Sequence, residues 1–343
     1  MPDSAVVRRP QAAKVVVVTG GSAGVGRATV EAFARDGWNV GIIARGQERL
    51  DRASAAVRSF GRNACAVSAD VADADAIEQA AARIEGELGP IDVWVNNAMA
   101  TVFSPVAKLT PAEFLRGTQV TYLGQVHGTM TALRRMRERN RGTIVNVGSA
   151  LSYRAVPLQS VYCGAKYAVR GFTDALRSEI FHDGLNVHLT MVHLAAMNTP
   201  QFDWGLNKMP ERPQPVPPIF EPEVAARAIL FAATHHRREI WVGFPTVRAI
   251  IANKIAPGLL DRYLARVGYS GQLTAEPTPP DAPANLFAPA EGDWGAHGRF
   301  DSRARDVSWE LWTSRHRSVL MATVLILSGI GVRGLLRLAR RRT

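Results

Sequence analysis

The sequence predicts an α/β fold in which a doubly wound parallel sheet is covered by helices on both faces. Short apolar segments alternate with longer segments of helical spacing about six times along the chain. The short segments are largely apolar instead of alternating between apolar and polar residues, which is typical of strands buried on both faces. The chain has 343 residues and is 47% apolar and 21% charged, which allows a large core and excludes a mainly disordered protein.

About seven buried strands are expected, at residues 15–18, 39–44, 64–69, 91–96, 143–147, 186–193 and 239–242. Helical spacing predicts helices between them, at residues 27–36, 47–60, 73–88, 111–140, 156–182 and 223–235. The chain then divides into an N-terminal arm (1–13), a main domain (14–245), a helical extension (246–275), a proline-rich linker (276–306) and a basic, apolar C-terminal segment (307–343).

Two proline-rich segments interrupt the alternation. Residues 210–222 contain six prolines with apolar neighbours, so they form either a lid over the carboxyl edge of the sheet or a plain surface loop. Residues 276–290 contain five prolines, which is typical of a linker and underlies the boundary given above.

The first strand ends in a glycine-rich turn that opens a helix, Thr19-Gly20-Gly21-Ser22-Ala23-Gly24-Val25-Gly26. Glycines allow a sharp turn and a close approach to a pyrophosphate, and the helix N-terminus offers free N–H groups and a favourable dipole. Strand, turn and helix together predict a dinucleotide site, although the glycines at 20, 24 and 26 depart from the usual G-x-G-x-x-G spacing.

Arg45 ends the second strand, where an NAD site places an acid for the ribose 2′-hydroxyl. A guanidinium forms a charge-assisted fork with a phosphate, so Arg45 favours NADP(H) over NAD(H). The alternative is a solvated arginine at a strand end.

A candidate catalytic group follows the fifth strand. Ser149 ends this strand, and Tyr162 and Lys166 follow at a spacing that places both on one helical face. A phenol with its usual pKa of about 10 is a poor base at neutral pH. We expect the Lys166 ammonium to lower that pKa. We also expect the Ser149 hydroxyl to stabilise the reacting oxygen of the substrate.

Over roughly residues 14–245, these features resemble the short-chain dehydrogenase/reductase family, whose domain is of the Rossmann type. Further matches are Asp70-Val71 and Asn96-Asn97-Ala98. The resemblance implies that Tyr162 is the acid/base, that Ser149 polarises the substrate oxygen, and that Lys166 holds the nicotinamide ribose and lowers the Tyr162 pKa. It also implies positions along the cofactor, with Asp70 and Val71 at the adenine, Asn97 in the cleft, Ser22 at the 2′-phosphate and Thr199 near the carboxamide. Val25 completes the predicted cofactor contacts.

Three positions depart from the family pattern. Thr121 stands where the family commonly has an asparagine, and a hydroxyl lacks the donors and acceptor of an amide for a proton relay. Met99 replaces a glycine after Asn96-Asn97-Ala98, and Leu194-Ala195 replaces a Pro-Gly pair. The catalytic group remains, so we expect an active enzyme.

The net charge of +11 is concentrated at the C-terminus. Residues 299–343 contain ten arginines and three acidic residues, so they carry +7 of the total and nucleic acid is not an expected partner. The run 318–332 has no charge and lies between tryptophans and arginines, which is typical of a membrane interface. We expect residues 309–343 to attach to a membrane by lying in the interface or spanning it; the alternative is a terminal helix packed on protein.

The sequence thus predicts an NADP(H)-dependent oxidoreductase that moves a hydride between nicotinamide and a carbonyl or secondary alcohol of an apolar substrate. The rival is a catalytically silent, cofactor-binding protein tethered to a membrane. By family resemblance, the helices near 113–139 and 156–181 pair between subunits, which implies a homodimer or homotetramer. The two cysteines, Cys65 and Cys163, suit a reduced cytoplasm, and no metal site is expected.

Overall fold

Seven parallel strands form the central sheet of the computed structural model, which describes residues 13–316. Their order across the sheet is β11-β7-β6-β4-β1-β2-β3. Their bounds are β1 (Val15–Thr19), β2 (Asn39–Ala44), β3 (Ala64–Ser68), β4 (Ile91–Asn96), β6 (Gly142–Ser149), β7 (Val187–Leu194) and β11 (Glu239–Trp241). The prediction of a doubly wound parallel sheet is confirmed.

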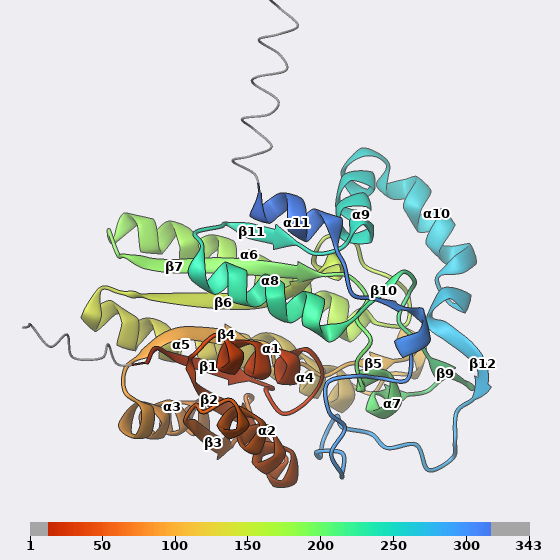
Figure 1. Ribbon diagram of the computed structural model, residues 1–343. Coiled ribbons are helices and arrows are strands. Elements are labelled where there is room, and N and C mark those ends of the chain that lie inside the picture. The colour runs from red at the N-terminus through yellow and green to blue at the C-terminus, as the bar shows by residue number, and fades with distance from the viewer. Residues whose placement is uncertain (1–12, 317–343) are drawn as a thin grey trace, which may run out of the picture.

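Helices cover both faces of the sheet (Figure 1). One face carries α1 (Gly24–Arg35), α2 (Gln47–Ser59) and α8 (Pro222–Thr234), and the other carries α3 (Ala74–Leu88), α5 (Gly124–Arg139) and α6 (Ser160–His182). Successive residues of a strand point to opposite faces, so Val16 and Val18 belong to one apolar cluster and Val15 and Val17 to the other. The strands are therefore apolar on both of their faces instead of on one.

The expected helix 111–140 is divided in the structure. It consists of α4 (Pro111–Thr118), a π-helical turn (Gln119–Leu123) and α5. Buried Thr121 lies in this turn, where its hydroxyl accepts from the Ala100 N–H at 2.9 Å and donates to the Ala100 carbonyl at 2.8 Å. These bonds tie the turn to the chain after β4. The other difference is that α6 begins at Ser160, since Leu158 has a φ of 67° that no right-handed helix contains.

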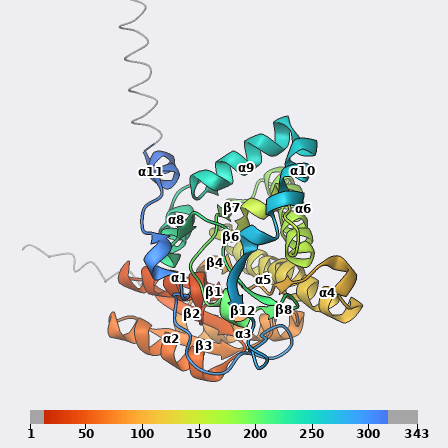
Figure 2. The same cartoon turned by 90° about the vertical axis from the view of Figure 1, so that its right-hand side faces the viewer.

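The chain after β11 returns across the carboxyl edge of the sheet (Figures 1 and 2). Two helices, α9 (Phe244–Ile255) and α10 (Pro257–Val267), project from the domain. Beyond them, β12 (Leu273–Pro277) pairs with β9 (Glu211–Pro213), and β13 (Ala304–Arg305) pairs with β10 (Ile219–Phe220). Helix α11 (Trp309–Arg315) ends the described chain. The smaller elements are β5 (Val102–Phe103), β8 (Leu206–Asn207), α7 (Gln201–Trp204) and short 3-10 turns at Val106–Lys108, Ala150–Ser152, Ser270–Gln272 and Asp301–Arg303.

Within residues 13–316, no helix combines the length and apolarity needed to cross a membrane. The predicted apolar run 318–332 lies outside the described residues.

Candidate active site

The glycine turn between β1 and α1 has backbone conformations that suit glycine. Gly20 has a φ of 66° and Gly24 a φ of 56°, in the left-handed region. At Gly26, an added Cβ would lie 2.0 Å from the Gly20 carbonyl oxygen, so no side chain fits there. The turn is thus folded tightly against the start of α1, and its backbone faces the cavity described below.

Asn97 fixes the turn from the neighbouring strand. Its side-chain Nδ2 donates to the carbonyls of Thr19 at 3.2 Å and Gly20 at 3.3 Å. The Thr19 hydroxyl in turn accepts from the Asn97 N–H at 3.1 Å. These contacts join β1 and β4, which lie where the strand order reverses, the place at which open α/β sheets bind ligands.

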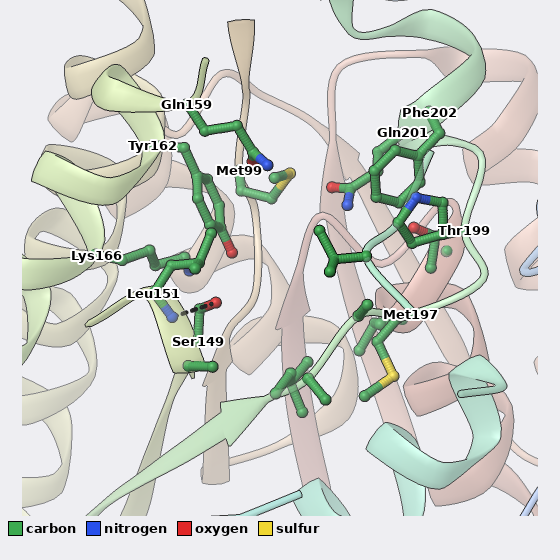
Figure 3. A pocket seen from close by; sticks show the side chains of 18 of the residues that line it. Met99, Ser149, Leu151, Gln159, Tyr162, Lys166, Met197, Thr199, Gln201 and Phe202 are labelled. Atoms are coloured by element: carbon green, nitrogen blue, oxygen red, sulfur yellow. Dashed lines mark hydrogen bonds between the residues drawn. The ribbon is translucent and has the colours of Figure 1, made fainter. Parts of the chain in front are cut away.

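Ser149, Tyr162 and Lys166 come together at the carboxyl end of β6 (Figure 3). The Ser149 Oγ accepts from the Leu151 N–H at 3.1 Å, which orients the hydroxyl at the start of a short 3-10 turn. Buried Lys166 donates from Nζ to the Val147 carbonyl at 2.6 Å, and this Nζ lies 5.5 Å from the centre of the Tyr162 ring. The three side chains that sequence spacing predicts as a group are neighbours.

Burial controls the ionisation of this group. Burial raises the pKa of the Tyr162 phenol above its usual value, although a hydrogen bond with Ser149 acts in the opposite direction. Burial also lowers the pKa of Lys166 from 10.5 to about 7. The sequence predicts that a charged Lys166 lowers the pKa of Tyr162. The structure differs because the same burial that desolvates the phenol removes much of the charge from Lys166 at neutral pH.

A single cavity of about 930 Å³ joins the catalytic group to the glycine turn. This volume lies near the upper end of the usual range for ligand pockets, which is roughly 300–1,000 Å³. Its lining includes nearly all of the sequence-predicted site residues, namely Gly20, Ser22, Gly24, Val25, Arg45, Asp70, Val71, Asn97, Ser149, Tyr162, Lys166 and Thr199. Gly26 lies behind the turn, where it allows the close packing described above.

Charged residues gather at the Arg45 end of the cavity. Asp70 accepts a hydrogen bond from Arg116, and its second oxygen accepts from the Ala72 N–H at 3.0 Å. Burial alone would raise the pKa of Asp70, but the Arg116 and Ala72 hydrogen bonds lower it below its usual value. The pKa of Arg45 is lowered by burial and by the nearby charges of Arg116 and Arg49, with Asp70 opposing. Three guanidinium groups, of Arg45, Arg49 and Arg116, thus lie at this end, and the charges of Asp293 and Glu48 act on Arg49 as that of Asp70 acts on Arg45.

The residues that depart from the family pattern differ in whether they line the cavity. Thr121 is not part of the cavity wall, because its hydroxyl is directed to Ala100. Met99, Leu194 and Ala195 do line the cavity, and Met99 lies between Tyr162 and Thr199 in Figure 3. The proline-rich segment left open as a lid or a loop contributes Gln214, Pro215, Val216 and Pro217 to the wall.

Sequence reasoning missed several residues of the site. Arg49 lines the cavity and lies over the Trp204 ring at 4.9 Å, and its place in the first turn of the helix that follows Arg45 was a usable signal. Buried Gln125 donates to the same Val147 carbonyl as Lys166, at 3.1 Å. Asn285 also lines the cavity, but it comes from the segment expected to be a linker, and no sequence signal pointed to it.

A cluster of possible metal ligands lies elsewhere in the described chain. His297, Glu221 and Asp301 have ligand atoms within 4.8 Å of one another. His297 also contacts Glu223 at 2.9 Å, and together these carboxylates raise the pKa of His297 although burial acts against them. The cluster is thus a set of ion pairs that holds residue 297 to the start of α8.

Comparisons with known proteins agree with the fold. The family model described as short chain dehydrogenase matches residues 14–206. The chain belongs to this family. It is 28% identical over 317 residues to the uncharacterized oxidoreductase YxnA of Bacillus subtilis, covering 91% of this chain and 88% of that protein.

Two other similarities extend this result. The uncharacterized oxidoreductase Rv1543 of Mycobacterium tuberculosis is 33% identical over 258 residues, covering 74% of this chain and 73% of the relative. An alcohol dehydrogenase from the archaeon Thermococcus sibiricus, solved in complex with 5-hydroxy-NADP, shares the fold. The two structures superpose with a TM-score of 0.58 and a sequence identity of 24%. The superposition covers 67% of this chain and 95% of the alcohol dehydrogenase. The protein is therefore a short-chain dehydrogenase/reductase, an oxidoreductase that uses a nicotinamide cofactor.

Proposed function

We propose that the chain is an NADP(H)-dependent oxidoreductase that interconverts a carbonyl group and a secondary alcohol on an apolar substrate. The observation that carries the proposal is the single cavity, which has the glycine turn at one end and Ser149, Tyr162 and Lys166 at the other. Its glycine turn fits a dinucleotide, because the backbone of Gly20 and Gly24 lines the cavity in left-handed conformations at the N-terminus of α1. When bound, the cofactor supplies or accepts a hydride at the nicotinamide.

Each side chain of the catalytic group has a role in the proposal. Ser149 donates a hydrogen bond to the substrate oxygen, and Tyr162 transfers the proton to or from that oxygen. The raised pKa of Tyr162 keeps the phenol protonated at neutral pH, which suits proton donation during carbonyl reduction. Lys166 positions the nicotinamide ribose and is held in place by the Val147 carbonyl.

The preference for NADP(H) is supported by the charges at the other end. Arg45 and Arg49 both line the cavity, and either guanidinium can form a charge-assisted fork with a 2′-phosphate. We expect tighter binding of NADPH than of NADH, measured as the ratio of their dissociation constants. Arg45→Ala should reduce this ratio toward one, whereas a matched Arg52→Ala, on an exposed part of α2, should not.

The test of the reaction is NADPH oxidation with a panel of ketones and aldehydes of increasing apolar size. Tyr162→Phe should lower turnover about 10³-fold while NADPH binding persists, since only the transferable proton is lost. The matched control is Tyr167→Phe, which removes the hydroxyl of a 41% exposed tyrosine on the same helix. Binding without turnover on any substrate, unchanged in Tyr162→Phe, would instead favour the catalytically silent protein.

We also propose that the C-terminal region attaches the protein to the cytoplasmic face of a membrane. Apolar side chains are exposed on α9, α10 and α11, among them Ile255 (78% exposed), Leu259 and Trp309 (71%). Exposed Lys254 and Arg262 lie on the same helices, and the arginine-rich residues 317–343 follow α11 in the sequence. Apolar and basic side chains together suit an anionic lipid surface.

The position of α9 and α10 also supports an apolar substrate. Ala249, Ala252 and Leu264 of α9 and α10 line the cavity, so these helices have one side on the cavity and apolar residues exposed on the other. An apolar ketone dissolved in lipid would then have a short path to Tyr162.

Flotation with phosphatidylserine vesicles tests the membrane proposal. The full-length protein should float, and Ile255→Glu with Leu259→Glu should reduce the bound fraction, because charge is added to the apolar surface. Val106→Glu, at an exposed apolar residue outside these helices, is the control. Protein that stays at the bottom of the gradient would refute attachment.

We further propose that the chain forms a homodimer or homotetramer through α5 and α6. Met130, Tyr167 and Phe181 are exposed apolar residues on these two helices, and subunit contacts would cover them. Light scattering coupled to gel filtration measures the mass directly, and a monomer at all concentrations would contradict this proposal.

A further inference from the structure

The segment of residues 285–298, here called the strap, crosses the Arg45 end of the cofactor cavity. It follows β12 and runs as the blue loop beside α2 and α7 (Figure 1). At its start the Asn285 N–H donates to the Trp204 carbonyl at 2.9 Å. Near its end the Gly298 N–H donates to the Asn198 carbonyl at 3.3 Å. Both anchors lie next to residues that line the cavity.

The strap binds Arg45, the residue on which the NADP(H) preference rests. The guanidinium donates to three consecutive strap carbonyls, those of Asn285, Leu286 and Phe287, the last at 3.1 Å. A guanidinium has five N–H donors, so this arrangement fixes its orientation while leaving it donors for a phosphate. The strap therefore decides where Arg45 points.

Leu286 fixes the strap at this point. Its side chain is completely buried, in the apolar cluster that also contains Ala69 and Val71. Its carbonyl accepts from Arg116 Nε at 3.0 Å, and Arg116 is also the partner of Asp70. The strap is thus joined to the residues that, by family resemblance, border the adenine.

The strap also contacts the glycine turn. The Gly295 carbonyl accepts from the Gly24 N–H at 2.9 Å. Trp294 meets Trp204 edge to face, with ring centres 5.3 Å apart. At Gly298 an added Cβ would lie 2.6 Å from the Thr199 carbonyl oxygen, so the strap and the main domain are in close contact.

The cavity remains open while the strap is seated. Asn285 lines it together with Gly24, Arg45, Asp70 and Val71, and the volume of about 930 Å³ includes this end. The strap is therefore an outer wall of the cavity. A ligand at this end would be enclosed between the strap and the carboxyl ends of β1 and β2.

We propose that the strap is a component of the cofactor site that closes over the adenosine end of bound NADP(H), orients Arg45 toward the 2′-phosphate, and must detach before the cofactor leaves. This inference rests on the proposed function only in taking NADP(H) as the ligand. It assigns Leu286 as a positioning residue, since the strap carbonyls hold Arg45 only while the Leu286 side chain is seated.

The rate of NADPH release from the full-length protein tests the proposal. NADPH fluorescence is followed after mixing the complex with excess NADP⁺ and no substrate. Leu286→Ala should speed release about tenfold, and should weaken NADPH binding more than NADH binding, because Arg45 loses its orientation. The matched control is Val307→Ala, which truncates a 51% exposed side chain outside the strap and should leave release nearly unchanged.

A second strap variant and a hydrogen-exchange measurement test the proposal independently of Leu286→Ala. Trp294→Ala should also speed release, and thermal unfolding checks that each variant is folded. In the wild type, hydrogen exchange of residues 285–298 should slow when NADPH binds. Equal release rates in Leu286→Ala, Trp294→Ala and Val307→Ala, or faster strap exchange on binding, would overturn the proposal. Because no turnover is needed, a catalytically silent protein that binds NADPH still gives a decisive answer, and a protein that binds no NADPH refutes both proposals.

Discussion

Lys166 shows at the scale of one residue how burial changes chemistry. Its side chain is 1% exposed and its Nζ contacts a backbone carbonyl. In such surroundings the charged form is disfavoured, and the pKa falls to about 7. Proton uptake by Lys166 is therefore coupled to folding.

The pH dependence of stability tests this coupling. Between pH 7 and about 8.5, unfolded Lys166 holds a proton that the folded residue has largely lost, so the free energy of unfolding should rise with pH, by up to about 1.4 kcal/mol per unit. At higher pH the raised pKa values of buried Cys65 and Cys163 act in the opposite direction. Urea unfolding should show a flatter pH slope in Lys166→Met than in Lys254→Met, an exposed control. Equal slopes would contradict the low pKa.

Arg45 illustrates what sequence can predict about a residue and what it cannot. Its place at the end of β2 predicts a position at the cofactor site, because the carboxyl ends of parallel strands share one edge. Its contacts with the carbonyls of Asn285, Leu286 and Phe287 were not predictable. Backbone carbonyls carry no residue-specific signal, and these residues are distant in sequence.

At the scale of elements, the turn between β1 and α1 depends on close backbone packing. The third residue of α1, Gly26, faces the Gly20 carbonyl, and Asn97 closes the turn from β4. Any side chain at residue 26 must push the helix away from the strand. The glycine pattern was therefore readable from sequence, because it reflects a local steric requirement.

Gly26→Ala should destabilise the protein by about 3 kcal/mol and abolish NADPH binding, since its Cβ meets a carbonyl oxygen. Gly86→Ala, inside α3 and with open space around it, should instead stabilise by about 0.5–1 kcal/mol through helix propensity. Denaturant midpoints and NADPH titrations of the two variants make the comparison. Normal NADPH affinity in Gly26→Ala would mean that the turn does not hold the cofactor.

The division of the predicted helix 111–140 was not readable from sequence. Its apolar spacing continues through Thr121, but the hydroxyl of this residue pairs with the Ala100 backbone and the helix adopts a π-helical turn. A long-range hydrogen bond overrides the helical pattern there.

At the scale of the whole molecule, the sequence predicted the seven strands because most of their residues are apolar and pack against helices on both faces of the sheet. The path of the chain after β11 could not be predicted from the sequence. A proline-rich composition indicates that a segment forms no regular helix or strand, but it does not indicate where the segment packs. The contacts of residues 285–298 were therefore seen only in the structure. The match with YxnA covers 91% of the chain, so it includes this segment as well as the main domain.

The proposed hydride transfer would use the glycine turn and the candidate catalytic group together, since both line one cavity. The most direct test uses NADPH that carries deuterium at the transferable position of nicotinamide C4, with mass spectrometry of the products from the ketone and aldehyde panel. The wild-type protein should form an alcohol with one deuterium on the former carbonyl carbon, and Tyr162→Phe should form almost none. If the wild type binds NADPH but transfers deuterium to no carbonyl compound, or if Tyr162→Phe transfers it equally fast, the proposed function is wrong.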